Sequence, residues 1–196
     1  MKTILNIPPE VYMELQKHLL PYLHTNEEAA FVFADVVLYD EQVELNYRDW
    51  YAVQPNDYKS RSAYNFELTH KTNGRIIKRA HDLNACIIEF HSHIDQEFLR
   101  FSPTDWKGFS EFVPLVLWRL KGKPYVAIVV TNHGVDALVW MDDANKPKGL
   151  NAIKTGETEV LPTNNSLKQD NDECYYCNAV RGQGDKANLD RYLGSV

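Results

Sequence analysis

The chain has 196 residues, of which 44% are hydrophobic and 24% charged, and its net charge is −6. These values predict one packed globular domain, with length left for a tail. The acidic balance argues against a general binder of nucleic acid or of anionic membranes, since both need clustered Lys and Arg, and three cysteines are too few for a disulfide framework.

The first third of the chain predicts a helix followed by antiparallel strands. Pro8, Pro9 and Glu10 open the helix, because proline suits the first turn and a carboxylate complements the positive end of the helix dipole. Pro21 ends it. The segments that follow are expected to be a strand at 29–40, its antiparallel neighbour at 42–53, a polar loop at 54–62 and a short strand at 63–69.

The middle of the chain predicts a buried strand between two helices. A helix is expected at 70–84, and the short apolar run 85–90 after it is typical of a central strand. Ser102 is a natural N-cap and Pro103 suits the first turn, so another helix is expected from there. The last elements are two strands and the hairpin turn between them, at 124–131, 135–142 and 132–134.

After Asp143 the sequence becomes polar and loses sustained periodicity. We therefore expect a folded domain over residues 1–142 and a partly ordered C-terminal extension, a tail or linker, over 143–196. Cys174 and Cys177 form a lone Cys-x-x-Cys in this extension, and a zinc ribbon needs a second pair. We interpret them as incidental cysteines, with a half-site shared across an oligomer as the alternative. The order of elements predicts an α/β or α+β fold, with a central mixed β-sheet flanked by helices.

The stretch "FHSHIDQEFLRFSPTDW" (90–106) carries the most informative polar residues. His91 and His93 follow the predicted central strand two residues apart, so both point to the same side of an extended chain. Asp105, in the first turn of the next helix, can supply a third ligand, and zinc readily accepts imidazole nitrogen and carboxylate oxygen. Other acids that are candidates for this site are Asp95, Glu97, Glu27 and Glu28.

An isolated His-x-His predicts little, because the pattern is common. The His-x-His-x-Asp-His metal pattern is not met, since Gln96 stands where the last histidine is required. The His-x-His hydrolases built on TIM barrels need about 250 residues, which is longer than this chain. The Ser-x-x-Asp of Ser102 and Asp105 at a helix start, just after a buried strand, strengthens the metal interpretation.

Together, "HSH" and "SPTD" resemble the His-x-His…Ser-x-x-Asp signature of the JAMM (MPN+) metalloproteases, which include zinc-dependent deubiquitinases and bacterial JAB-type relatives. The family pattern also has an upstream glutamate, and "EEAAFVFA" (27–34) supplies it. Glu27 fits that position better than Glu28 does, with Ala30 and Ala34 in place of two glycines. The resemblance covers residues 5–142 and implies a cytidine-deaminase-like MPN/JAMM fold.

Two residues depart from the family pattern. Ile94 stands where proline is usual, and the spacer 94–101 is one residue longer than the common form. Because the ligands lie outside the insertion, the extra residue leaves their coordination possible and changes only the path of the loop. The segment "GFSEFVPLVLWRLKGKPYVAIVV" further resembles bacterial members found beside ubiquitin-activating-like and conjugating-like enzymes.

The resemblance implies a zinc-dependent isopeptidase and a role for each motif residue. Zn²⁺ would be held by His91, His93 and Asp105, with water in the fourth position as the nucleophile. Glu27 would be the general base and then the general acid, and the Ser102 hydroxyl would stabilise the oxyanion. The residues alone leave plainer roles open: Ser102 as a helix N-cap, and Glu27 as a solvated residue at a helix end.

The implied substrate is the amide or isopeptide bond after the C-terminus of a ubiquitin-like protein, whose extended tail adds as a strand to an exposed sheet edge. The enzyme would remove or mature this modifier in a bacterial antiphage conjugation system, with activating-like and conjugating-like enzymes as further partners. Loops 54–62 and 94–101 would flank the substrate groove. Three apolar residues of the second loop are expected to pack back on the domain rather than contact a partner: Phe98, Leu99 and Phe101.

Two other functions stay open on the sequence. One is a JAMM-type hydrolase of a small-molecule or carrier-protein conjugate in sulfur or cysteine metabolism. The other is a non-catalytic MPN scaffold, against which the joint presence of the metal-binding residues argues. No nucleic acid or membrane partner is expected, and the lack of a signal-peptide pattern or of a run of about 18 apolar residues favours a cytoplasmic location.

Overall fold

The computed structural model describes residues 1–23, 25–94 and 99–168. Its helices and strands, in chain order, are β1 (Lys2–Asn6), α1 (Pro9–Leu19), β2 (Ala29–Leu38), β3 (Gln42–Ala52), the 3-10 helix η1 (Pro55–Asp57), β4 (Tyr58–Arg61), β5 (Phe66–Leu68), α2 (His70–Asp82), β6 (Cys86–Ser92), α3 (Pro103–Arg119), β7 (Tyr125–Thr131), β8 (Gly134–Trp140), β9 (Lys148–Gly149), β10 (Ala152–Thr155), β11 (Thr158–Val160) and α4 (Asn165–Lys168).

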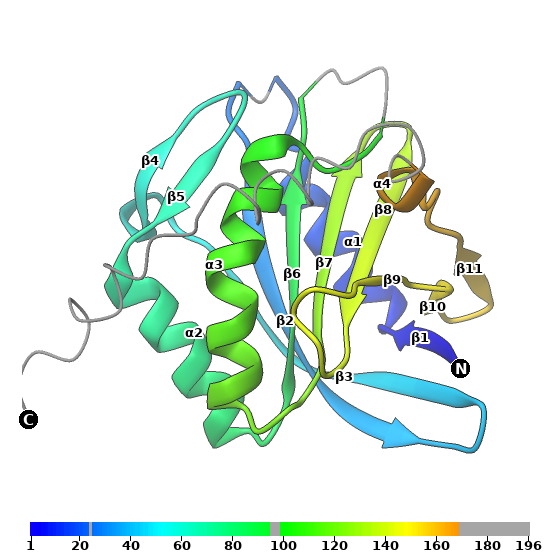
Figure 1. The fold of residues 1–196 in the computed structure, drawn as a ribbon. Coiled ribbons are helices and arrows are strands. Elements are labelled where there is room, and N and C mark those ends of the chain that lie inside the picture. Colours follow the sequence, from blue (N-terminus) through cyan, green and yellow to red (C-terminus); the bar gives the residue numbers. More distant parts are fainter. Residues whose placement is uncertain (24, 95–98, 169–196) are drawn as a thin grey trace, which may run out of the picture.

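Nine strands form one mixed sheet in the order β11-β10-β1-β3-β2-β6-β7-β8-β9, and β4 and β5 pair separately (Figure 1). β2 is antiparallel to both β3 and β6, whereas β6 is parallel to β7 and β1 is parallel to β3 and β10. A parallel pair needs a crossover connection, and α3 supplies it between β6 and β7. The fold is therefore mixed α and β, and the predicted central mixed sheet flanked by helices is confirmed.

The two faces of the sheet carry separate hydrophobic cores. On one face Leu15 of α1 packs in a cluster with Val32 of β2. On the other face Ile76 of α2 and Val113 of α3 pack in a cluster with Phe33 of β2. Val32 and Phe33 are neighbours but serve different cores, because successive side chains of a strand point to opposite faces.

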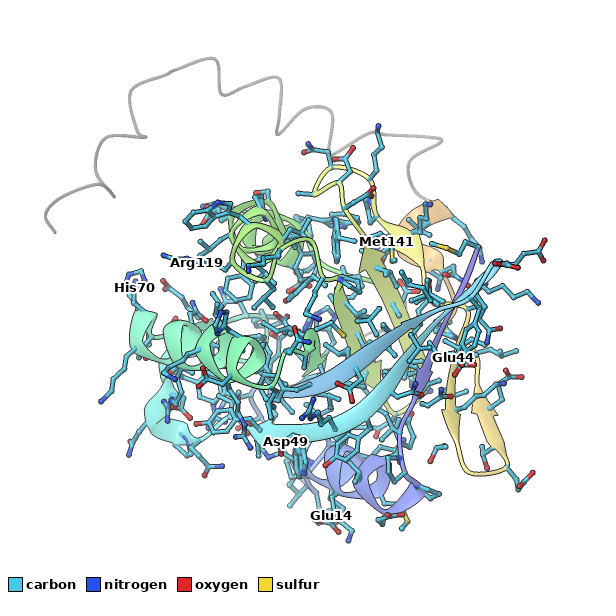
Figure 2. The ribbon with its side chains drawn as sticks, turned by 90° about the horizontal axis from the view of Figure 1, so that it is seen from below. Glu14, Glu44, Asp49, His70, Arg119 and Met141 are labelled. Atoms are coloured by element: carbon cyan, nitrogen blue, oxygen red, sulfur yellow. The ribbon has the colours of Figure 1, made fainter. Side chains whose placement is uncertain are left out.

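The helices lie on both sides of this sheet. In Figure 2, Glu14 marks α1 on one side, and His70 and Arg119 mark α2 and α3 on the other. α1 begins at Pro9 and ends at Leu19, as its proline signals predict. None of the helices in the described part of the chain is long and apolar enough to cross a membrane.

The expectation of a polar loop at 54–62 is wrong for most of that segment, which forms η1 and β4. The buried carboxylate of Asp57 holds the segment in place. Its Oδ1 accepts hydrogen bonds from Thr72 Oγ1 at 3.0 Å and from Arg75 Nη2 at 2.6 Å, both on α2. The polar composition of this segment predicts a loop because the segment is anchored by a buried acid and its hydrogen-bond donors, and not by apolar contacts.

Residues 148–168, part of the extension that was expected to be partly ordered, form strands and a short helix. β10 lies between β1 and β11 in the main sheet, and β9 pairs with β8. Ile153 of β10 is fully buried. These strands are short and β10 pairs with the far end of the chain, so no local periodicity marks them. Residues 169–196, with Cys174 and Cys177, lie outside the described residues.

Candidate metal centre

The structure brings the three predicted metal ligands together. His91 lies near the end of β6, His93 just follows it, and Asp105 lies in the first turn of α3. The ligand atoms of all three lie within 4.8 Å of one another. In Figure 1 this point is the upper end of the sheet, where β6 finishes and α3 begins. The described residues therefore include a group that is able to hold a metal ion.

Backbone pairing fixes both histidines on one side of the chain. β6 continues to Ser92, two residues beyond the predicted strand end. Ser92 faces away from the histidines, and its Oγ accepts the N–H of Glu28 at 2.9 Å. The N–H of His93 donates to Val130 O of β7 at 3.0 Å. The backbone is therefore still extended at His93, so the side chains of His93 and His91 lie on the same side of the chain.

The start of α3 places the third ligand. Asp105 Oδ2 accepts the N–H of Ser102 at 2.7 Å, and Ser102 Oγ accepts the N–H of Asp105 at 3.2 Å. These two bonds form a capping box, which satisfies the free backbone donors at the helix start. The predicted N-cap role of Ser102 is confirmed, and the same geometry turns the Asp105 carboxylate toward the histidines.

Asp105 makes polar contacts with both histidines. Its Oδ2 lies 3.1 Å from His93 Nε2, and its Oδ1 lies 3.6 Å from His91 Nε2. Burial alone would raise the pKa of Asp105, but the positive charge of His91 and the hydrogen bond from His93 hold that pKa well below its usual range. The Asp105 side chain is therefore an anionic carboxylate throughout the physiological pH range.

Glu27, and not Glu28, faces this group. Glu27 Oε1 lies 3.7 Å from His93 Nε2, and the residue is 1% exposed. Glu28 instead pairs with Arg61 of β4, at 2.5 Å. Two other acids considered from the sequence, Asp95 and Glu97, lie outside the described residues.

The environment of Glu27 favours its protonated form. Burial raises the pKa of Glu27 to about 7, and the negative charge of Asp105 acts in the same direction. The positive charge of His91 opposes both effects. Glu27 is therefore a carboxyl group that exchanges its proton near neutral pH.

The polar atoms at this point fit a bound cation. At this centre, three buried atoms have no hydrogen-bond partner among the described residues: Glu27 Oε2, His91 Nε2 and His93 Nδ1. A buried polar atom without a partner costs about 1–3 kcal/mol, so its presence calls for an explanation. Two imidazoles and one carboxylate form a donor set that divalent zinc accepts, and coordination removes part of this cost.

Sequence reasoning missed a second buried acid, Glu89, beneath the histidines. Its Oε1 lies 3.2 Å from His91 Nδ1, and the hydroxyl of Tyr125 donates to its Oε2. Burial alone would lower the pKa of His91, but Asp105 and Glu89 together raise that pKa to about 10. The spacing of two residues that groups His91 with His93 also predicts that Glu89 shares their side, so the signal was present in the sequence.

Aromatic side chains enclose the centre. The His91 ring lies 5.7 Å from the Phe66 ring of β5 and 5.6 Å from the Phe101 ring, between ring centroids. Leu99 and Phe101 are buried, which confirms the prediction that they pack back on the domain. Phe98 of the same loop lies outside the described residues. The contact with Phe66 also brings the β4–β5 pair to the rim of the centre.

The C-terminal segment that was expected to be a tail supports this loop. The N–H of Phe101 donates to Ser166 Oγ at 2.9 Å, and Asn165 Nδ2 donates to Leu99 O at 3.0 Å. Ser166 is held in turn by Asp136 of β8, which is fully buried and accepts both the Ser166 hydroxyl and its N–H. Residues far along the chain therefore help to shape the approach to Ser102.

Comparison of the sequence with protein-family models and with curated proteins finds no match. The fold and the site define a mixed α and β protein with a candidate metal centre of two histidines and one aspartate. Its function is therefore argued from that centre and from the resemblance of its residues to a known signature.

Proposed function

We propose that the protein is a zinc-dependent hydrolase of the JAMM (MPN+) type, and that its nine-stranded sheet and helices are a variant of the MPN fold. The observation that carries the proposal is the position of Glu27. The signature requires a glutamate from the first long strand beside the His-x-His and Asp ligands, and Glu27 Oε1 lies 3.7 Å from His93 Nε2.

Zinc suits the donor set best, because it readily binds imidazole nitrogen and carboxylate oxygen in a site that keeps one open position. His91, His93 and Asp105 would hold the ion, and when bound it supplies Lewis acidity and an activated water for hydrolysis. Because Asp105 is anionic, the site is expected to bind a dication in preference to a neutral molecule.

Glu27 would move the proton during hydrolysis. In the metal-free protein the pKa of Glu27 is about 7, so this group takes up and releases a proton with little free-energy cost at neutral pH. Its carboxylate would therefore accept a proton from the attacking water and deliver it to the leaving amine. Burial at the edge of the centre keeps bulk water from competing for that proton.

Ser102 combines a structural and a proposed catalytic role. Its Oγ accepts the N–H of Asp105, and a hydroxyl still has its own proton to donate after accepting one bond. Ser102 is partly exposed at the mouth of the centre, so that proton is available to a substrate carbonyl oxygen. A fixed donor of this kind stabilises the negative charge that develops on the oxygen during acyl transfer.

The substrate we propose is the amide or isopeptide bond after the C-terminus of a ubiquitin-like protein. An extended C-terminal tail binds by adding as a strand, and β4 and β5 form a two-stranded pair beside the centre (Figure 1). The reaction removes or matures the modifier. We place it in a bacterial antiphage conjugation system in the cytoplasm, with activating-like and conjugating-like enzymes as partners.

Two glutamate variants of purified, zinc-loaded protein test this proposal. The substrate is a ubiquitin-like protein with a fluorogenic C-terminal amide. Glu27→Gln is expected to lower kcat by about 10²- to 10⁴-fold while zinc content stays near one ion per chain. Glu28→Gln is the matched control and keeps activity. An equal loss of activity in both variants would show that Glu27 is not the specific proton carrier. If the zinc-loaded protein cleaves only small cysteine conjugates, the substrate is not a ubiquitin-like protein.

A further inference from the structure

A chain of three buried polar groups runs beneath the metal centre. Tyr125 of β7 donates its hydroxyl proton to Glu89 of β6, and Glu89 Oε1 lies 3.2 Å from Nδ1 of His91. A carboxylate only accepts hydrogen bonds, so Nδ1 of His91 carries the proton in this pair. The other nitrogen, Nε2, lies 3.6 Å from Asp105 Oδ1 and is the atom left to face a metal ion.

The register of β6 and β7 explains how these groups meet. Glu89 pairs with Ala127, while Tyr125 pairs with Ile87, two residues earlier on β6. The methyl group of Ala127 leaves room on this face for the Tyr125 ring to extend toward Glu89. The ring itself is fully buried and packs against Trp140, with 5.8 Å between ring centroids.

Packing gives no reason for an acid at this position. Glu89 is 8% exposed, and the buried neighbours on its face of the sheet include Ile87, Ala127 and Val129. A buried carboxylate is destabilising unless its partners compensate for the lost water. The partners of Glu89 are one metal ligand and one tyrosine, and burial together with the charge of Glu89 raises the pKa of Tyr125 well above its usual value, so the tyrosine keeps its proton to donate.

From this arrangement we infer that Glu89 is a positioning residue for metal binding, with Tyr125 as its support. Glu89 holds His91 in the tautomer that presents Nε2 to the ion, and its negative charge adds to that of Asp105 in favour of a dication. Carboxylates that orient ligating histidines in this way strengthen metal binding. This inference rests on the metal centre of the proposed function and adds a residue that the family resemblance does not assign.

The effect is measured as zinc affinity, in competition with a chromophoric chelator at pH 7. Glu89→Gln keeps the size of the side chain and removes its charge, and we expect it to weaken zinc binding by about 10- to 100-fold. Tyr125→Phe removes only the hydroxyl, so a smaller loss in the same direction is expected. Glu28→Gln is the matched control, because Glu28 is paired with Arg61 away from the ligands and its loss leaves zinc affinity unchanged.

A nitrogen NMR measurement separates positioning from a purely structural role. In the zinc-loaded wild type, His91 is expected to carry its proton on Nδ1 and to bind through Nε2, whereas Glu89→Gln weakens the Nδ1 proton signal. A structural role alone would lower the melting temperature of the metal-free variant and leave affinity and tautomer unchanged, which would overturn the inference. If Glu89→Gln does not fold, Tyr125→Phe carries the same test.

The outcomes also distinguish this inference from the proposed function. A wild-type protein that binds no zinc overturns both. A wild type that binds zinc tightly, with Glu89→Gln and Tyr125→Phe within twofold of it, overturns only the role of Glu89.

Discussion

Asp105 Oδ2 lies 2.7 Å from the backbone nitrogen of Ser102, so one carboxylate both caps α3 and faces the two histidines. The folding of the helix start and the assembly of the metal centre are therefore coupled. The metal-free protein already holds this ligand in place, because the capping box fixes the side chain before any ion binds.

Changing Asp105 to asparagine separates these two roles. Asparagine keeps an oxygen that can accept the N–H of Ser102, so the metal-free variant is expected to lose no more than about 1 kcal/mol of unfolding free energy. Zinc affinity should fall by more than about 100-fold, the upper range for residues that only support a ligand. Chemical denaturation and chelator competition measure the two effects. Asp82→Asn, at an exposed site on α2, is the control. If Asp105→Asn binds zinc as tightly as the wild type does, Asp105 is not a zinc ligand.

Ser102 offers a similar separation of capping from catalysis. Glycine is a fair N-cap, so Ser102→Gly is expected to cost only about 0.3 kcal/mol of unfolding free energy. The variant loses the hydroxyl donor. We expect kcat to fall by about 10²- to 10³-fold with zinc content unchanged. Ser102→Thr keeps both the cap and the hydroxyl and should retain activity. If the glycine variant stays fully active, Ser102 is a helix cap alone.

The raised pKa of Glu27 predicts a pH dependence of stability in the metal-free protein. Its pKa is about 7 in the folded state against 4.5 for the free group, so between these values the folded state binds more protons than the unfolded state. The contribution of Glu27 is therefore fully present below pH 4.5 and is lost as the pH rises through 7. Glu27→Gln removes this titration.

Denaturation at pH 5 and at pH 8 measures the effect. From pH 5 to pH 8, the unfolding free energy of the wild type relative to that of Glu27→Gln should fall by about 3 kcal/mol. Comparing the two proteins cancels the titration of the other carboxylates and histidines. A difference that stays constant with pH would show that Glu27 has an ordinary pKa.

Ser166 should matter for stability although it lies far from the centre in sequence. Ser166→Ala removes a donor to the buried Asp136 and the acceptor for the N–H of Phe101, which predicts a loss of about 1–3 kcal/mol of unfolding free energy. Ser110→Ala, at an exposed site on α3, is the matched control and should change stability by less than about 0.5 kcal/mol. Equal effects in both variants would contradict the role given to Ser166.

A chain that ends after Asp142 tests the sequence-based domain boundary. This truncation removes β10, the parallel partner of β1, and leaves the buried edge of β1 without hydrogen bonds. We expect the shortened chain to lose its cooperative thermal transition, followed by circular dichroism. A shortened chain that melts cooperatively near the wild-type temperature would restore the boundary at residue 142.

The sequence predicts what depends on local signals. The N-cap at Ser102, the proline at the start of α3 and the spacing of His91 and His93 each act over a few residues, so the metal ligands follow from them. The place of β10 depends on its pairing with β1 near the other end of the described chain, for example Ile4 with Ala152, and no local pattern records it. The contact of Glu89 with Tyr125 depends on the register of two parallel strands, which only the packed sheet sets.

The position of β1 has a consequence for how the protein is made. On the ribosome β1 emerges before the other described strands, yet one of its edges meets its neighbour β10 only after nearly the whole described chain has been synthesised. Until then an apolar strand with an open edge is exposed to other nascent chains, which favours intermolecular pairing. A chaperone that covers β1 during synthesis should therefore raise the yield of folded protein.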